Sequence, residues 1–98
     1  MRIVYTDHLR ARLKEREIPL KIVKEIFDKA EEYYLDKLRG HNIVVSTVKY
    51  QGKLRKALLA YDTISEEEVE AITVHPITSE QIKQRVSSGR WIHEKTQS

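Results

Sequence analysis

A Gln51-Gly52 pair divides the longest stretch of strand-like sequence in this chain. Residues 43–50 and 54–62, on either side of it, are rich in β-branched, aromatic and aliphatic residues, a composition typical of strands. Two residues that include a glycine, placed between two such stretches, predict a tight antiparallel hairpin. Because side chains alternate across a strand, this turn would also fix which residues share a face.

A two-residue turn gives the hairpin two mixed faces. One face carries Val44, Ser46, Val48, Tyr50, Arg55, Ala57, Leu59 and Tyr61, and the other carries Ile43, Val45, Thr47, Lys49, Leu54, Lys56, Leu58 and Ala60. We expect one face to pack on helices and the other to expose apolar groups beside basic ones, as a surface for a ligand or partner does. A longer turn would change this assignment.

The N-terminal third predicts two helices. Residues 2–5 are a short strand or an extended lead-in, and Thr6 or Asp7 can cap a helix that runs to about Glu17. Pro19 suits the first position of a second helix, because its missing N–H would be unpaired there anyway. We expect the two helices to form a hairpin.

The rest of the chain predicts strands followed by one short helix. Residues 33–35, 43–50, 54–62 and 69–77 are expected to form four antiparallel strands, with an acidic connection at 64–70. Residues 78–81 match a capping box, and Gly89 can end the helix that follows. The predicted fold is α+β: an N-terminal helix hairpin packed on a four-stranded antiparallel sheet, with a short C-terminal helix. Residues 1–93 make a single domain and residues 94–98 a flexible tail.

Charge and composition narrow the class of partner. Both ends of the chain are basic, whereas acids concentrate at residues 66–70, and the net charge is +3. If the two ends meet, they would focus a positive field that favours RNA or DNA; solvated surface lysines are the alternative. There is no cysteine and no apolar run long enough to span a bilayer, so we expect a cytoplasmic protein without a membrane partner.

A basic row is predicted on the first helix. His8, Arg12 and Arg16 are four residues apart, so they lie along one line beside the apolar stripe. Such a row can hold a phosphate. In the alternative interpretation, the stems cover apolar surface and the charged heads pair with Glu15, Glu17 or the sheet.

Residues 6–18 match the pattern T-x-H-x-x-x-R-x-x-x-R-x-I, and the ending from Ile72 to Trp91 contains Val-His-Pro and Gly-Arg-Trp. With the predicted order of elements, these motifs resemble a poorly characterised, RelE-like branch of the RelE/ParE toxin superfamily of bacterial and archaeal toxin–antitoxin modules. The resemblance covers about residues 2–92. It implies an antitoxin partner and, for many members, RNA cleavage without a metal, often on the ribosome. The matching positions are His8, Arg12, Arg16, His75, Arg85, Arg90 and Trp91.

Metal-independent RNA cleavage needs a base for the 2′-hydroxyl proton, a cation beside the phosphate and an acid for the leaving oxygen. His75 is the best candidate acid or base, because the unperturbed pKa of histidine is about 6.5. Arg85 or Arg55 can hold the phosphate, and Tyr61 can donate a proton or stack on a base. Trp91 either stacks on a base or fills the core. The remaining candidate RNA contacts are His8, Arg12, Arg16, Lys49 and Arg90.

No histidine spacing indicates a metal site, and no cofactor is expected. Two functions therefore remain open. The first is a toxin-like endoribonuclease that acts on messenger RNA, free or on the ribosome, and is neutralised by an antitoxin. The second is a non-catalytic module that binds a protein, a nucleic acid or a second copy of itself.

Overall fold

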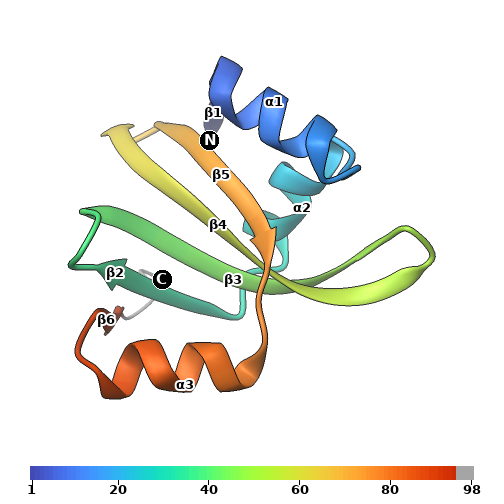
Figure 1. The fold of residues 1–98 in the computed structure, drawn as a ribbon. Helices are drawn as coiled ribbons and strands as arrows, with labels where there is room; N and C mark the ends of the chain where they lie inside the picture. Colours follow the sequence, from blue (N-terminus) through green and yellow to red (C-terminus); the bar gives the residue numbers. More distant parts are fainter. Residues whose placement is uncertain (95–98) are drawn as a thin grey trace.

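The computed structural model describes residues 1–94, which form a six-stranded mixed sheet with three helices (Figure 1). The sheet order is β1-β5-β4-β3-β2-β6, with β1 parallel to β5 and every other neighbouring pair antiparallel. In chain order the elements are β1 (Arg2–Tyr5), α1 (Asp7–Glu15), α2 (Lys21–Asp28), β2 (Glu32–Asp36), β3 (His41–Tyr50), β4 (Lys53–Ser65), β5 (Glu68–Pro76), α3 (Ser79–Ser87) and β6 (Trp91–Glu94).

The expected four-stranded antiparallel sheet is wrong, because a four-residue strand adds to each edge. β1 pairs in parallel with β5, where Arg2 lies opposite Glu68, and β6 pairs with β2, where Trp91 lies opposite Asp36. Strands this short carry too few residues to show an alternating pattern of their own. Their partners are distant in the sequence, so local signals do not reveal the pairing.

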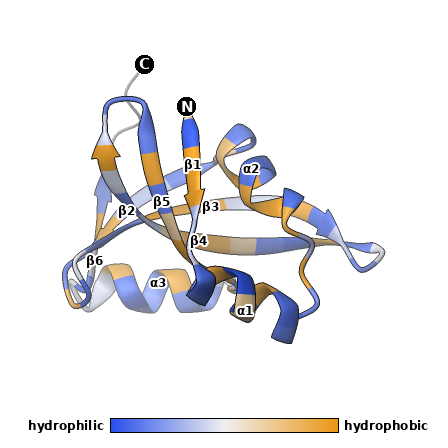
Figure 2. Ribbon diagram, turned by 90° about the horizontal axis from the view of Figure 1, so that it is seen from above, coloured by the Kyte–Doolittle hydropathy of each residue, from blue (hydrophilic) through white to orange (hydrophobic). Residues whose placement is uncertain are grey.

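The expected helix hairpin is also wrong. The main contacts of α1 are with β5, and those of α2 are with β3 and β4. Figure 2 shows α1 and α2 lying apart from one another, although buried residues of both helices belong to one core on the same face of the sheet. The apolar side of each helix is therefore covered by the sheet rather than by the other helix. The stripe on α1 is narrow, since Leu9 and Leu13 are its only buried residues.

The chain reversal after α1 has a specific geometry. The amide of Ile18 donates to the carbonyl of Leu13 at 2.9 Å, and the amide of Glu17 donates to that of Lys14 at 3.2 Å. These two bonds, with Glu17 at φ 55°, make a Schellman motif that ends the helix at Glu15 rather than at the expected Glu17. Ile18 and Leu13 are both buried, which is the hydrophobic contact that accompanies this motif.

The central hairpin confirms the prediction from Gln51-Gly52. Tyr50 lies opposite Lys53, and Gln51 and Gly52 have φ angles of 52° and 74°. Positive φ at both central residues is what a type I′ turn requires. The register then runs through Val48 opposite Arg55, so both faces have the predicted membership.

Each face of the sheet carries its own hydrophobic core, and the central strands β3 and β4 contribute to both. Below α1 and α2 the core includes Ile22, Ile26, Val44 and Leu59, all with 0% exposure. Below α3 the second core is smaller, and Trp91 is its largest side chain. The hydrophobic colours along the central strands in Figure 2 follow this arrangement.

The C-terminal helix confirms its capping box: Thr78 Oγ1 accepts from the amide of Gln81, whose side chain accepts from the amide of Thr78. Gly89 follows at φ 80°. The acidic connection is shorter than expected, because β4 runs to Ser65 and β5 starts at Glu68. Within residues 1–94 no helix is long and apolar enough to cross a membrane. The predicted tail at 94–98 lies, beyond Glu94, outside the described residues.

Candidate functional site

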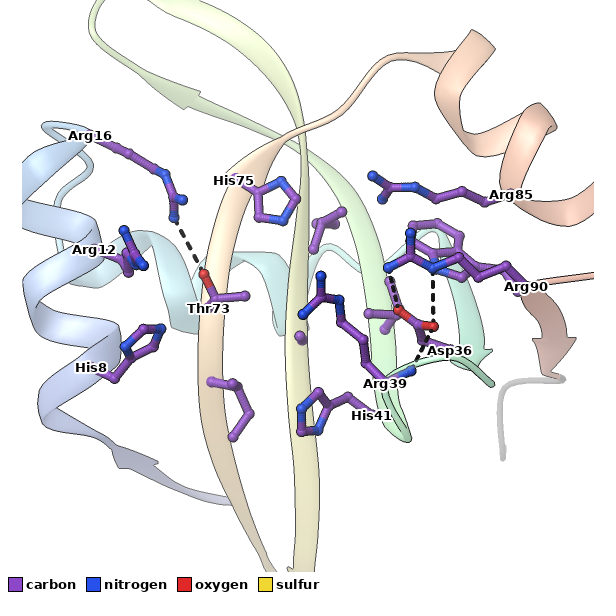
Figure 3. A pocket seen from close by; sticks show the side chains of 15 residues that line it. His8, Arg12, Arg16, Asp36, Arg39, His41, Thr73, His75, Arg85 and Arg90 are labelled. Carbon is purple, nitrogen blue, oxygen red and sulfur yellow. Dashed lines mark hydrogen bonds and ion pairs between the residues drawn. The ribbon is translucent and has the colours of Figure 1, made fainter. Parts of the chain in front are cut away.

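A cleft of about 480 Å³ lies on the face of the sheet that carries α3. Apolar residues of β3, β4 and β5 form its floor, and α1, the β2–β3 turn and α3 form its walls (Figure 3). We call it the basic cleft, because five arginines and three histidines line it with a single carboxylate. These residues are Arg12, Arg16, Arg39, Arg85, Arg90, His8, His41, His75 and Asp36.

Helix α1 supplies the predicted row of His8, Arg12 and Arg16. β1 pairs only with residues 68–71, so α1 packs along the rest of β5 and turns this row toward the cleft. Nη1 of Arg16 donates to the carbonyl of Val74 at 2.9 Å and to Oγ1 of Thr73 at 3.3 Å. The row thus reaches the cleft. Two of its guanidinium groups are also paired, as the alternative interpretation of the row predicted: Arg16 with the sheet, and Arg12 with Glu15 at 3.2 Å.

Asp36, which the sequence analysis did not single out, holds two of the arginines in place. Asp36 is only 3% exposed, and its carboxylate accepts from Nε and Nη2 of Arg90 at 3.3 and 3.1 Å. It also accepts from the amides of Leu38 and Arg39, which orders the turn that presents Arg39. Burial alone would raise the pKa of Asp36, but the hydrogen bonds from Arg90 and Arg39 outweigh it and lower the pKa.

Arg85 reaches the cleft from α3 and lies over the ring of Trp91, 5.0 Å from its centroid. Burial, with Arg90 and Arg39 nearby, lowers the pKa of Arg85, although it stays a cation at neutral pH. Trp91 is 1% exposed and also contacts Tyr34, at 5.0 Å between ring centroids. Trp91 therefore fills the core, and its role at the cleft is to support Arg85 rather than to stack on a base.

His75 lies between the two groups of arginines. It sits opposite Leu58 of the cleft floor, and Figure 3 shows its ring between Arg16 and Arg85. Burial, together with the positive charges of Arg16 and Arg85, lowers the pKa of His75 below its ordinary 6.5. The imidazole is therefore neutral at pH 7, as a general base must be.

His41, also missed, forms a pair with Asp62 at the far end of the cleft. Nδ1 of His41 lies 2.8 Å from Oδ1 of Asp62, and because an ionised carboxylate only accepts, Nδ1 is the donor. The sequence contained a signal for this pair. The register set by the two-residue turn at Gln51-Gly52, continued along both strands of the hairpin, places His41 directly opposite Asp62. The pair fixes the orientation of an imidazole that lines the cleft.

Three predicted site residues lie outside the basic cleft. Tyr61 is on the opposite face of the sheet, with its ring 5.1 Å from that of Phe27, and burial, with Tyr33 and Glu94 nearby, raises its pKa to about 12. Arg55 is on that face too, over the ring of Tyr50 at 5.1 Å. Lys49 shares the face of the cleft but lies at the outer end of the β3–β4 hairpin.

Within residues 1–94 no group of three or more histidine, aspartate or glutamate side chains could hold a metal ion. The site instead combines guanidinium groups with imidazoles, which can bind a phosphate and transfer protons. No protein-family model matches this chain, and no curated protein and no solved structure matches it significantly.

Proposed function

We propose that the basic cleft binds the phosphodiester backbone of RNA and cleaves it without a metal ion. The observation that carries the proposal is that five arginines from separate parts of the chain meet three histidines in one cleft whose single carboxylate is paired with Arg90. Such a cleft attracts a polyanion, and guanidinium groups suit phosphate because they donate two parallel hydrogen bonds.

In the proposed reaction, neutral His75 takes the proton of a 2′-hydroxyl. The 2′-oxygen attacks the adjacent phosphorus and the bond to the 5′-oxygen breaks, which leaves a 2′,3′-cyclic phosphate and a 5′-hydroxyl. Arg16 and Arg85, on either side of His75, stabilise the charge that develops on the phosphate. The leaving oxygen needs a proton, and His8 and His41 face the same cleft for that step.

We propose further that this activity belongs to a toxin–antitoxin module in the cytoplasm of a prokaryote, with RNA or the ribosome as target and an antitoxin as inhibitor. The support is that the motif positions at residues 8, 12, 16, 75, 85, 90 and 91 line a single cleft although they come from both ends of the chain. The proposal of a toxin–antitoxin module therefore rests on these residues and not on the architecture of the sheet.

The test is RNA cleavage by the purified chain in the presence of EDTA, followed by gel electrophoresis and primer extension. We expect discrete cuts with cyclic phosphate ends, and we expect His75→Gln to lower the rate at least about 100-fold, as loss of a general base does. His93→Gln is the matched control, because His93 is exposed on β6 and does not line the cleft.

A second readout is growth after induced expression, where the wild-type chain should arrest cells and His75→Gln should not. Salt-sensitive RNA binding with intact RNA would replace the enzyme with the non-catalytic binding module. If His75→Gln is folded, like the control His93→Gln, and still cleaves RNA, His75 is not the general base.

A further inference from the structure

The outer part of the β3–β4 hairpin carries a second group of cations outside the basic cleft. We propose that this part, residues 49–56 and called the lysine arm below, binds the backbone of an RNA strand where it continues beyond the cleft. The inference rests on the proposed function, because it adds a contact for the same RNA. The cations of the arm are Lys49, Lys53, Arg55 and Lys56.

The first argument is charge. No aspartate or glutamate occurs between Asp36 and Asp62, so the lysine arm and the adjoining parts of β3 and β4, as far as Tyr61, are free of acids. Lys49 and Lys53 are exposed. Within residues 1–94, neither these two lysines nor Lys56 makes an ion pair. Unpaired lysines gain from a polyanion, because binding releases the counterions of the phosphates.

The second argument is position. The register places Lys49, Leu54 and Lys56 on the same face of the sheet as Leu58 and Ala60, which form part of the cleft floor. Lys49 is opposite Leu54, which at about 3.3 Å per residue lies about 13 Å along β4 from Leu58. Figure 1 shows this end of the hairpin projecting away from the rest of the molecule. A ligand that reaches both the cleft and the arm must therefore be long, as an RNA strand is.

The third argument is that the arm is fixed to the wall of the cleft. Nε2 of Gln51 donates to the carbonyl of Glu17 at 3.1 Å and to that of Arg16 at 3.4 Å. Tyr50 is 6% exposed and belongs to the core below α1 and α2. The turn is thus tied to the end of α1, whose Arg16 lines the cleft. An arm held in place loses less conformational entropy on binding than a flexible one.

A different role for these lysines makes a different prediction. Beyond the ends of β2 and β5 the hairpin has open edges, and lysines there also discourage pairing with other chains. That role would give no dependence on RNA length. A side chain such as Leu54, which is 73% exposed, shows that the arm does not cover a core.

The experiment compares two triple variants that lose the same charge. The arm variant is Lys49→Gln, Lys53→Gln and Lys56→Gln. The control is Lys14→Gln, Lys21→Gln and Lys29→Gln, on exposed positions near α1 and α2. Affinities are measured by fluorescence anisotropy with uncleavable 2′-O-methyl RNA of about 4 and about 20 nucleotides, sizes that bracket typical single-strand sites.

The measured quantity is the ratio of the affinity for the long RNA to the affinity for the short RNA. We expect the arm variant to lower this ratio about tenfold. We also expect it to reduce the slope of log affinity against log salt concentration, measured on the long RNA, by about 2. The control triple should keep the wild-type ratio, and melting temperatures should show that both variants fold. Equal ratios in the two triple variants would overturn the proposed role of the lysine arm. The proposed function would still stand if the wild-type chain binds the short RNA and Arg39→Gln weakens that binding. If the wild-type chain binds neither RNA, both proposals fall.

Discussion

Asp36 shows how much of the basic cleft depends on a single side chain. One buried carboxylate accepts four hydrogen bonds, two from the guanidinium of Arg90 and two from backbone amides of the turn that carries Arg39. An unpaired acid in a cationic cleft would oppose phosphate binding. Here its charge is paired, and its effect is to order two cations before any ligand arrives.

The pH dependence of RNA cleavage should report on His75. In the proposed reaction its base form is the active one, and burial and the nearby arginines lower its pKa, so kcat/KM should fall only as the pH drops below 6.5. Arg85→Gln removes a positive neighbour, which favours the imidazolium, so the pKa and the acid limb should move up toward 6.5.

Initial rates between about pH 4 and 8 measure this limb. Arg10→Gln is the control, since Arg10 is on α1 over the ring of Tyr5 and does not line the cleft. An acid limb at or above 6.5 in the wild-type chain would contradict the assignment of His75 as the base.

At the scale of elements, predictions succeeded where neighbouring residues determine the structure. The Gln51-Gly52 turn needs only positive φ at two positions, and the capping box of α3 needs only Thr78 and Gln81. The same local register places His41 opposite Asp62, a pair that was not among the predicted site residues. The end of α1 was misplaced because Glu17 is not a typical residue for the left-handed position of a helix end.

Glu17→Gly should raise the free energy of unfolding by about 1 kcal/mol, because glycine adopts a φ of 55° without the strain of a side chain. The carbonyl of Glu17 that accepts from Gln51 is kept. Urea unfolding measures the change. As a control, Glu25→Gly, inside α2, should lower the stability by about 1 kcal/mol, because glycine disfavours helix. A loss of stability in both variants would mean that the conformation at Glu17 is not strained.

At the scale of the molecule, residues that meet only through the tertiary fold escaped prediction. The row on α1 and His75 were placed in the site from local patterns, but nothing local shows that Asp36 and Arg39 complete it. Tyr61 and Arg55 were included by residue type, and the sheet turns them to the opposite face. Predicting the site in full requires the strand order, which depends on the two short edge strands.

The two cores should unfold together, because β3 and β4 belong to both. Ile22→Ala, in the core below α1 and α2, should lower stability by about 2–5 kcal/mol. The fluorescence of Trp91, the only tryptophan, reports on the other core. We expect the urea transitions followed by this fluorescence and by far-UV circular dichroism to shift equally. A Trp91 transition that stays at the wild-type midpoint would mean that the two faces melt separately.

The parallel pairing of β1 with β5 has a consequence for the order in which the basic cleft is assembled. β1 precedes both α1 and α2, yet its partner, from Glu68 to Ala71, follows three further strands in the sequence. Non-local pairing of this kind is slow compared with the formation of a helix or a hairpin. The cleft also needs Arg90 and Trp91, so a nascent chain has all the cations of the wall on α1 but no finished site. A chain in which β6 has not yet paired with β2 therefore lacks the complete basic cleft.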